Sequence, residues 1–74
     1  MEEKVLINTE YITLGQLLKL KNIINSGGQA KYFLNENNVK VNGILDNRRG
    51  KKLFNGDKVV INQNESFLIL KKDS

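Results

Sequence analysis

A hairpin signal in the middle of the chain constrains the fold more than any other feature. Residues 39–41 read Val-Lys-Val, an alternation with the period of a strand, so the valines are expected to face a core and the lysine the solvent. Asn42 and Gly43 follow, and both residue types accept the positive φ angles of a two-residue turn. The apolar pair at 44–45 then returns, which predicts two antiparallel strands.

Two short helices are predicted before this hairpin. Thr13 is an expected N-cap with Gln16 three residues later, the spacing of a capping box, and Ser26 with Gln29 repeats the pattern. Each helix then carries an apolar stripe at helical spacing, formed by Leu14, Leu17 and Leu18 in the first and by Ala30, Phe33 and Leu34 in the second. Neither helix is long enough to be stable alone in water, so both are expected to pack on a sheet.

Three further strands are predicted at 4–8, 58–62 and 66–70, which gives the order β-α-α-β-β-β-β. The sequence therefore predicts the α+β class, with two short helices packed on a small, mostly antiparallel sheet. The chain has 74 residues without a linker or repeat, so residues 1–74 are expected to form a single domain. The apolar segment 67–70 either completes the core or pairs with a second copy, which leaves the oligomeric state open.

The composition excludes several classes of site. The chain has no Cys and no His, so neither a disulfide nor a Cys/His zinc site can form. It has no P-loop or dinucleotide fingerprint, and Asp46 and Asp57 are isolated turn residues, so we predict no enzymatic activity, no cofactor and no metal. No apolar run approaches the ~20 residues that span a bilayer, and the start lacks the features of a signal peptide. A soluble intracellular protein is expected.

The net charge of +4 is concentrated in the middle of the chain. Residues 19–58 hold nine cations and three acids, a balance of +6, whereas the remainder holds three cations and five acids, a balance of −2. This distribution favours a polyanionic partner, although a basic surface that serves only solubility is the alternative.

A basic loop at residues 48–52 is the strongest single feature of this region. Its four cations surround one glycine and are Arg48, Arg49, Lys51 and Lys52. Four like charges in five residues repel one another, whereas guanidinium and ammonium groups suit phosphate oxygens. The loop is therefore predicted to contact nucleic acid; the alternative is an edge that its charges protect against strand pairing.

The start of the second helix is a second candidate anion site. Gly27 and Gly28 follow the expected cap Ser26. Because glycine has no side chain, a phosphate can closely approach the backbone amides at this helix start. In the alternative interpretation, the glycines relieve crowding against the first helix. Lys31 lies one turn later and is either a further phosphate contact or a solvated helix lysine. Lys21, near the end of the first helix, either contacts RNA or neutralises the C-terminus of that helix.

Two tyrosines are weaker candidates for contact with RNA. Tyr32 is expected to be partly exposed, where it could stack on an unpaired base, and Tyr11 is the less favoured of the two.

Taken together, these elements resemble a known family. The order of helix, Ser-capped helix, V-x-V-N-G turn, basic loop and L-x-x-G-D is similar to the ribosomal-protein S-four-type RNA-binding domain, or alpha-L motif, over about residues 12–61. The matching residues are Leu17, Leu18, Ser26, Ala30, Val39, Val41, Asn42, Gly43, Leu53, Gly56, Asp57 and Val59. The segments SGGQAK, VKVNG and NRRGKKL resemble most the small stand-alone proteins of the YaaA type.

The resemblance implies a cytoplasmic protein that binds RNA, often ribosomal or transfer RNA, through the two-helix face and the basic loop. Many members of the family carry an arginine after the capping serine, and this chain has Gly27 there, so that contact is not expected.

The expected function is non-catalytic recognition of structured RNA, with ribosomal RNA and a ribosomal subunit as the favoured partners, in ribosome assembly or function. The candidate RNA-binding residues are Lys21, Ser26, Gly27, Gly28, Lys31, Arg48, Arg49, Lys51 and Lys52. Two alternatives stay open: an adaptor whose basic face docks an acidic protein, and a DNA-binding protein. DNA binding is less favoured because the helix that usually reads a groove is missing.

Overall fold

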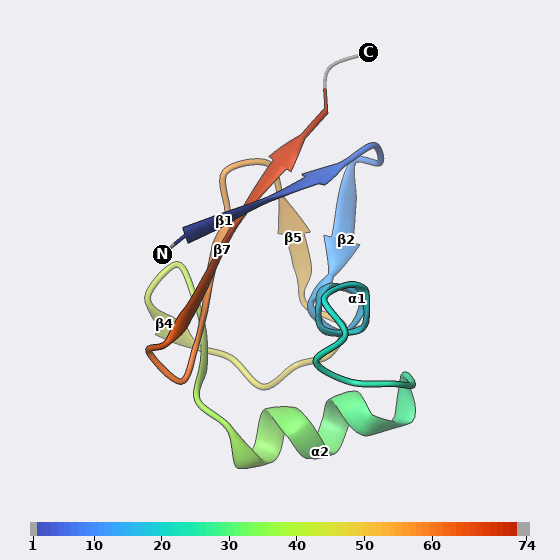
Figure 1. Cartoon of the computed structure of the whole chain (residues 1–74), viewed down its shortest axis with the longest axis vertical. Helices are drawn as coiled ribbons and strands as arrows, with labels where there is room; N and C mark the ends of the chain where they lie inside the picture. Colours follow the sequence, from blue (N-terminus) through green and yellow to red (C-terminus); the bar gives the residue numbers. More distant parts are fainter. Residues whose placement is uncertain (1, 73–74) are drawn as a thin grey trace.

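The computed structural model describes residues 2–72 and confirms the α+β class predicted from the sequence (Figure 1). The elements in chain order are β1 (Glu2–Ile7), β2 (Tyr11–Thr13), α1 (Leu14–Leu20), α2 (Gly28–Glu36), β3 (Val39–Val41), β4 (Ile44–Leu45), β5 (Lys52–Phe54), β6 (Lys58–Ile61) and β7 (Glu65–Lys71). The strands form a five-stranded sheet and a separate two-stranded sheet.

The larger sheet has the strand order β1-β7-β6-β3-β4. Its neighbours are antiparallel except for β1 and β7, which run parallel, so the prediction of a mostly antiparallel sheet is confirmed. The apolar final strand β7 lies between β1 and β6 rather than at an edge. Of the two roles left open for this strand, completion of the core is therefore the one observed.

The smaller sheet corrects the predicted element order. It pairs β2 with β5 in antiparallel register, and the sequence interpretation contained neither strand. Both strands have only three residues, which is too short for a period-two pattern to stand out. Lys52 was assigned to the basic loop, but it is the first residue of β5 and pairs with Thr13. Thr13 is both the last residue of β2 and the N-cap of α1.

The predicted hairpin is confirmed. Asn42 and Gly43 have φ angles of 52° and 84°, as a two-residue turn between antiparallel strands requires. The Asn42 side chain also fixes the neighbouring turn, because its Nδ2 donates to Asp57 Oδ1 at 3.0 Å and its Oδ1 accepts from the Lys58 amide at 2.9 Å. Asp57 in turn accepts from the Phe54 amide at 2.8 Å, which confirms its expected role in its own turn.

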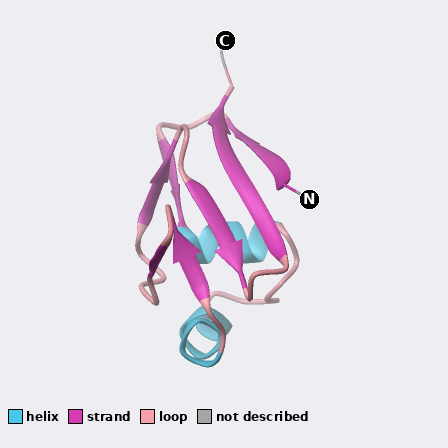
Figure 2. Cartoon of the chain, turned by 90° about the vertical axis from the view of Figure 1, so that its left-hand side faces the viewer, coloured by secondary structure: helices cyan, strands magenta, loops and turns pink. Residues whose placement is uncertain are grey.

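The core lies between the inner face of the large sheet and the two helices. Leu14, Leu17 and Leu18 of α1 have no exposed surface, so the predicted stripe is confirmed. Ala30 and Leu34 of α2 are buried as well. Figure 2 shows α1 behind the strands and α2 beneath their ends, seen along its axis. This arrangement brings the start of α2 close to the start of α1, where the candidate site lies.

Candidate nucleic-acid interface

Ser26 does not cap α2 with its hydroxyl, contrary to the prediction. The N-cap is Gly27, whose backbone is already helical (φ −60°, ψ −29°) and which has no side-chain cap. Because the turn starts early, Ser26 contributes its carbonyl, which accepts from the Gln29 amide at 3.1 Å. Only the reverse half of the capping box forms: Gln29 Oε1 accepts from the amides of Asn25 and Ser26 at 2.6 and 3.3 Å.

The amides of Gly27 and Gly28 are open. Within residues 2–72, no group accepts a hydrogen bond from either amide. A Cβ at either position would meet no neighbouring atom within 4 Å, so crowding against α1 does not account for the two glycines. Open amides at the positive end of a helix dipole can receive an anion.

The basic loop is fastened to the start of α1 by its backbone. The Leu14 amide donates to the Lys51 carbonyl at 2.8 Å, and the Gly15 amide donates to the Arg49 carbonyl at 2.9 Å. The loop itself turns tightly, with the Lys51 amide donating to the Arg48 carbonyl at 3.1 Å. Two unpaired amides of α1 are thereby satisfied, and the backbone of Arg49 and Lys51 is held against the start of α1.

Gly15 makes this docking possible, and the sequence interpretation missed it. A Cβ at Gly15 would lie 3.2 Å from the Arg49 carbonyl oxygen and 3.6 Å from the Cβ of Ala30. The loop, α1 and α2 therefore meet at a position where a larger side chain would collide. A glycine in the first turn of an otherwise strongly apolar helix was the one available signal.

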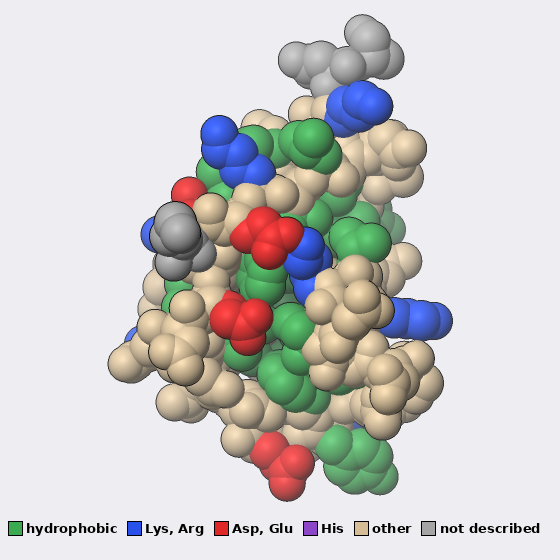
Figure 3. Space-filling view, viewed as in Figure 1, with side chains coloured by type: hydrophobic (Ala, Val, Ile, Leu, Met, Phe, Trp, Pro, Cys, Tyr) green, Lys and Arg blue, Asp and Glu red, His purple; other side chains and the backbone are tan. Residues whose placement is uncertain are grey.

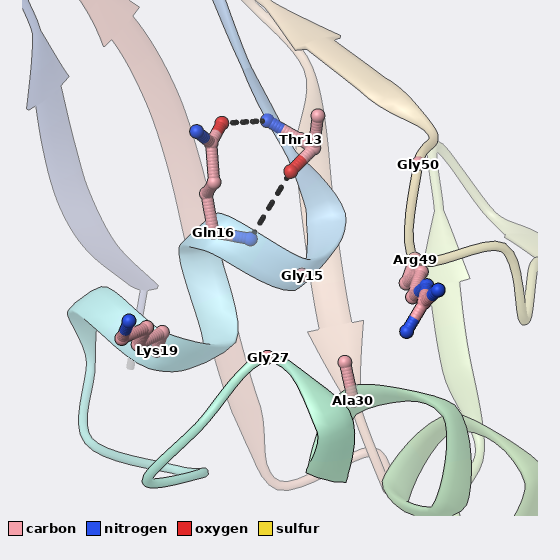
Figure 4. Close-up of a pocket in the computed structure, with 8 residues that line it drawn as sticks. All are labelled: Thr13, Gly15, Gln16, Lys19, Gly27, Ala30, Arg49 and Gly50. Carbon is pink, nitrogen blue, oxygen red and sulfur yellow. Dashed lines mark hydrogen bonds between the residues drawn. The ribbon is translucent and has the colours of Figure 1, made fainter.

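These three segments border an open hollow of about 410 Å³, which we call the cationic pocket (Figure 4). It is lined by Thr13, Gly15, Gln16, Lys19, Gly27, Ala30, Arg49 and Gly50. The predicted capping box of α1 borders it, with Gln16 Oε1 accepting from the Thr13 amide at 2.7 Å and Thr13 Oγ1 accepting from the Gln16 amide at 3.2 Å. Of the predicted site residues, only Gly27 and Arg49 line it.

Lys19 is a second residue that the sequence interpretation left out of the site. It lies on α1 across the pocket from Arg49, with Gly27 between the two segments in Figure 4. Its position four residues after Gly15 puts both on one helix face, which was the signal in the sequence. Within residues 2–72, Lys19, Arg49 and Lys51 have no carboxylate within ion-pair distance.

Arg48 differs from the other loop cations because it is paired. Its Nε and terminal nitrogen donate to the two Asp46 carboxylate oxygens at 3.0 and 2.7 Å, and its amide donates to the same carboxylate at 2.9 Å. These hydrogen bonds lower the pKa of Asp46 below its ordinary value and raise the pKa of Arg48. The negative charge of Asp46 thus reduces the repulsion among the four cations of the basic loop, and Arg48 is the cation with which it pairs.

The remaining predicted residues lie around the pocket or away from it. Lys31 is exposed on α2, and Lys52 places its ammonium 5.0 Å from the ring centre of Tyr11. Lys21 forms an ion pair with Glu3 of β1 and lies 5.9 Å from the ring centre of Phe67, so it does not border the pocket. The face in Figure 3 carries acidic and basic side chains side by side.

Residues 2–72 contain neither a metal-binding cluster nor a membrane-spanning helix. This part of the chain holds no cluster of three or more His, Cys, Asp or Glu side chains able to bind a metal ion. Neither of its helices is long and apolar enough to cross a membrane.

Comparison with known proteins agrees with this architecture. Residues 5–70 match the model of the S4 domain, which is the S-four-type domain that the sequence resembles. The chain is also 53% identical over 70 residues to a protein of Bacillus subtilis (strain 168) described as "Probable ribosome maturation protein RlbA". That match covers 95% of this chain and 99% of the relative. The predicted family is thereby confirmed: the chain belongs to the S4 domain family.

Proposed function

We propose that this protein is a non-catalytic RNA-binding protein that recognises structured ribosomal RNA during ribosome maturation in the cytoplasm. The S4 domain match and the ribosome maturation protein at 53% identity support the ribosomal context. The chemistry of the site supports an RNA ligand, because the cationic pocket joins open helix amides to unpaired cations. The described residues that line it include no Cys, His, Asp or Glu that could act as a nucleophile or as its base.

One observation carries the proposal. Within residues 2–72, Lys19 and Arg49 have no carboxylate within ion-pair distance, and both line the cationic pocket together with Gly27, whose amide is open. Fixed cations around an anion-receiving helix start fit a sugar–phosphate backbone. Such a site reads the shape and backbone of RNA more than its sequence.

The affinity should fall steeply with salt. If Lys19, Lys31, Arg49 and Lys51 neutralise about four phosphates, the affinity for ribosomal RNA drops by about two orders of magnitude between 50 and 200 mM salt. Fluorescence titration at several salt concentrations measures the slope, and circular dichroism verifies that the protein stays folded. A slope near zero would contradict binding through phosphates.

The double substitution Gly27→Ala and Gly28→Ala should separate stability from binding. Both positions have room for a methyl group, so the free energy of unfolding is expected to stay equal or rise by up to ~1 kcal/mol. The methyl groups keep a phosphate away from the amides, so the affinity for RNA is expected to fall several-fold. Thermal unfolding and RNA titration of the same sample test this, and unchanged affinity would argue against the helix start as a phosphate site.

Sedimentation of the native protein in cell lysate tests the proposed function as a whole. We expect it to migrate with a ribosomal subunit or its precursor at low salt and to be released by high salt or ribonuclease. A heavy complex that resists ribonuclease would overturn the proposal in favour of a protein adaptor. Competition of duplex DNA against ribosomal RNA decides the remaining alternative, since a DNA-binding protein would prefer the duplex.

A further inference from the structure

The β2–β5 sheet presents an aromatic pair to solvent beside the cationic pocket. Tyr11 and Phe54 are opposite one another in register, with ring centres 5.5 Å apart and planes at 46°. Their residues are 38% and 43% exposed. The next pair along the two strands, Ile12 and Leu53, points to the other side of the sheet, where Leu53 is fully buried. The alternation therefore directs both rings outward, along with Thr13 and Lys52.

Lys52 gives this face a second chemical property. Its ammonium lies 5.0 Å from the centre of the Tyr11 ring, and within residues 2–72 it has no carboxylate within ion-pair distance. One nucleotide carries both a flat base and a phosphate. An exposed aromatic pair with an ammonium over one of its rings offers a contact to each.

A hollow beside Tyr11 has one lining residue in common with the cationic pocket. A second hollow of about 480 Å³ is lined by Asn8, Thr9, Glu10, Tyr11, Ile12 and Gln16, and Gln16 also lines the cationic pocket. Glu10 is the acid on this path, and its charge is balanced by Lys71, whose ammonium donates to its carboxylate at 2.8 Å. Among residues 2–72, the hollow that leads from Gln16 to Tyr11 is therefore lined by no unpaired acid.

We propose that Tyr11 and Phe54 form a stacking site for an unpaired base of the RNA that occupies the cationic pocket, with Lys52 contacting the adjoining phosphate. The proposal rests on the proposed function and extends it: the ligand is a structured RNA with a single-stranded segment beside the helical part. Stacking on aromatic side chains is the usual way in which unpaired bases are held.

The test uses ribosomal RNA that carries 4-thiouridine and has been stripped of its proteins. Irradiation of its complex with the full chain, followed by mass spectrometry of the cross-linked peptides, is expected to find nucleotides on Tyr11 or Phe54. Cross-links confined to the basic loop and α2 would overturn the stacking site and leave the proposed function standing. A wild-type chain that neither binds nor cross-links to the RNA would overturn both.

Substitutions give an independent measurement. Tyr11→Leu with Phe54→Leu keeps apolar bulk but removes both rings, and is expected to weaken binding about tenfold, within the range for one stacked base. Tyr11→Phe with Phe54→Tyr keeps both rings and should bind as the wild type does. Tyr32→Leu removes an exposed ring that borders neither hollow, so it measures separately the stacking predicted for Tyr32 from the sequence.

The double variant Tyr11→Leu with Phe54→Leu also tests whether these rings serve the β2–β5 sheet or a protein partner instead of RNA. If it binds RNA as tightly as the wild type, the rings only stabilise the β2–β5 sheet or dock a protein, and the stacking site is overturned. Thermal unfolding accompanies each variant. If this double variant fails to fold, the single variant Phe54→Leu is measured with Tyr11 retained. The cross-linking experiment uses the wild-type chain, so it tests the stacking site even if no variant folds.

Discussion

Replacing Lys19, Arg49 and Lys51 by alanine together should lower the affinity for ribosomal RNA by about two orders of magnitude while leaving the fold intact. Each lost phosphate contact at an exposed site is worth ~1 kcal/mol, and three sum to ~3 kcal/mol. The fold should survive because loop docking uses the carbonyls of Arg49 and Lys51 rather than their side chains. RNA titration and circular dichroism of the triple variant test both statements.

Arg48 provides the matched control for this prediction. The double substitution Asp46→Asn and Arg48→Gln removes one acid and one cation of the same loop, so the net charge is unchanged. Since Asp46 already neutralises Arg48, the affinity should change less than about threefold, in contrast to the triple variant. An equal loss in both variants would mean that any disturbance of the loop suffices, and that Lys19, Arg49 and Lys51 do not contact phosphates.

Gly15→Leu should be the most damaging single substitution at the site. A Cβ there already lies 3.2 Å from the Arg49 carbonyl oxygen, so a leucine side chain must displace the loop and break the 2.9 Å hydrogen bond of the Gly15 amide. Overpacking of this kind costs ~2 kcal/mol, which lowers the melting temperature of a small domain by roughly 8–16 °C. With Arg49 and Lys51 displaced, the RNA affinity should fall about tenfold or more.

Gly15→Ala is the control for Gly15→Leu, because it also removes the glycine but adds only a methyl group against the loop. Its methyl group requires the loop to move by a few tenths of an ångström, and the helix propensity of alanine offsets this by ~1 kcal/mol. The melting temperature and the RNA affinity should therefore stay close to those of the wild type. A leucine variant that melts and binds like the alanine variant would show that the loop does not depend on this contact.

The features predicted correctly from the sequence are those that neighbouring residues determine. The Asn42-Gly43 turn, the Thr13 capping box and the leucine stripe of α1 each rest on residues within a few positions of one another. Their conformational preferences act locally, so a single sequence is enough to read them.

The features that were missed depend on distant partners. β5 becomes a strand only because β2, about forty residues earlier, supplies its hydrogen bonds. Gly15 and Lys19 belong to the site only because the loop at 48–51 folds back over α1. The cap of α2 failed for another reason: Gly27 adopts helical angles itself, so the turn begins early and Ser26 accepts the Gln29 amide with its carbonyl instead of its hydroxyl.

The parallel pairing of β1 with β7 also bears on how the chain folds. The register joins Glu2 to Ser66 and Ile7 to Lys71, contacts between residues more than sixty positions apart. The loop-closure entropy of such contacts must be overcome before they contribute stability, so a high contact order slows folding. During synthesis, β1 is made first but has no partner in the large sheet until β7 exists. The hairpin at Asn42-Gly43 can form earlier, so assembly of the sheet proceeds from the middle of the sequence outward.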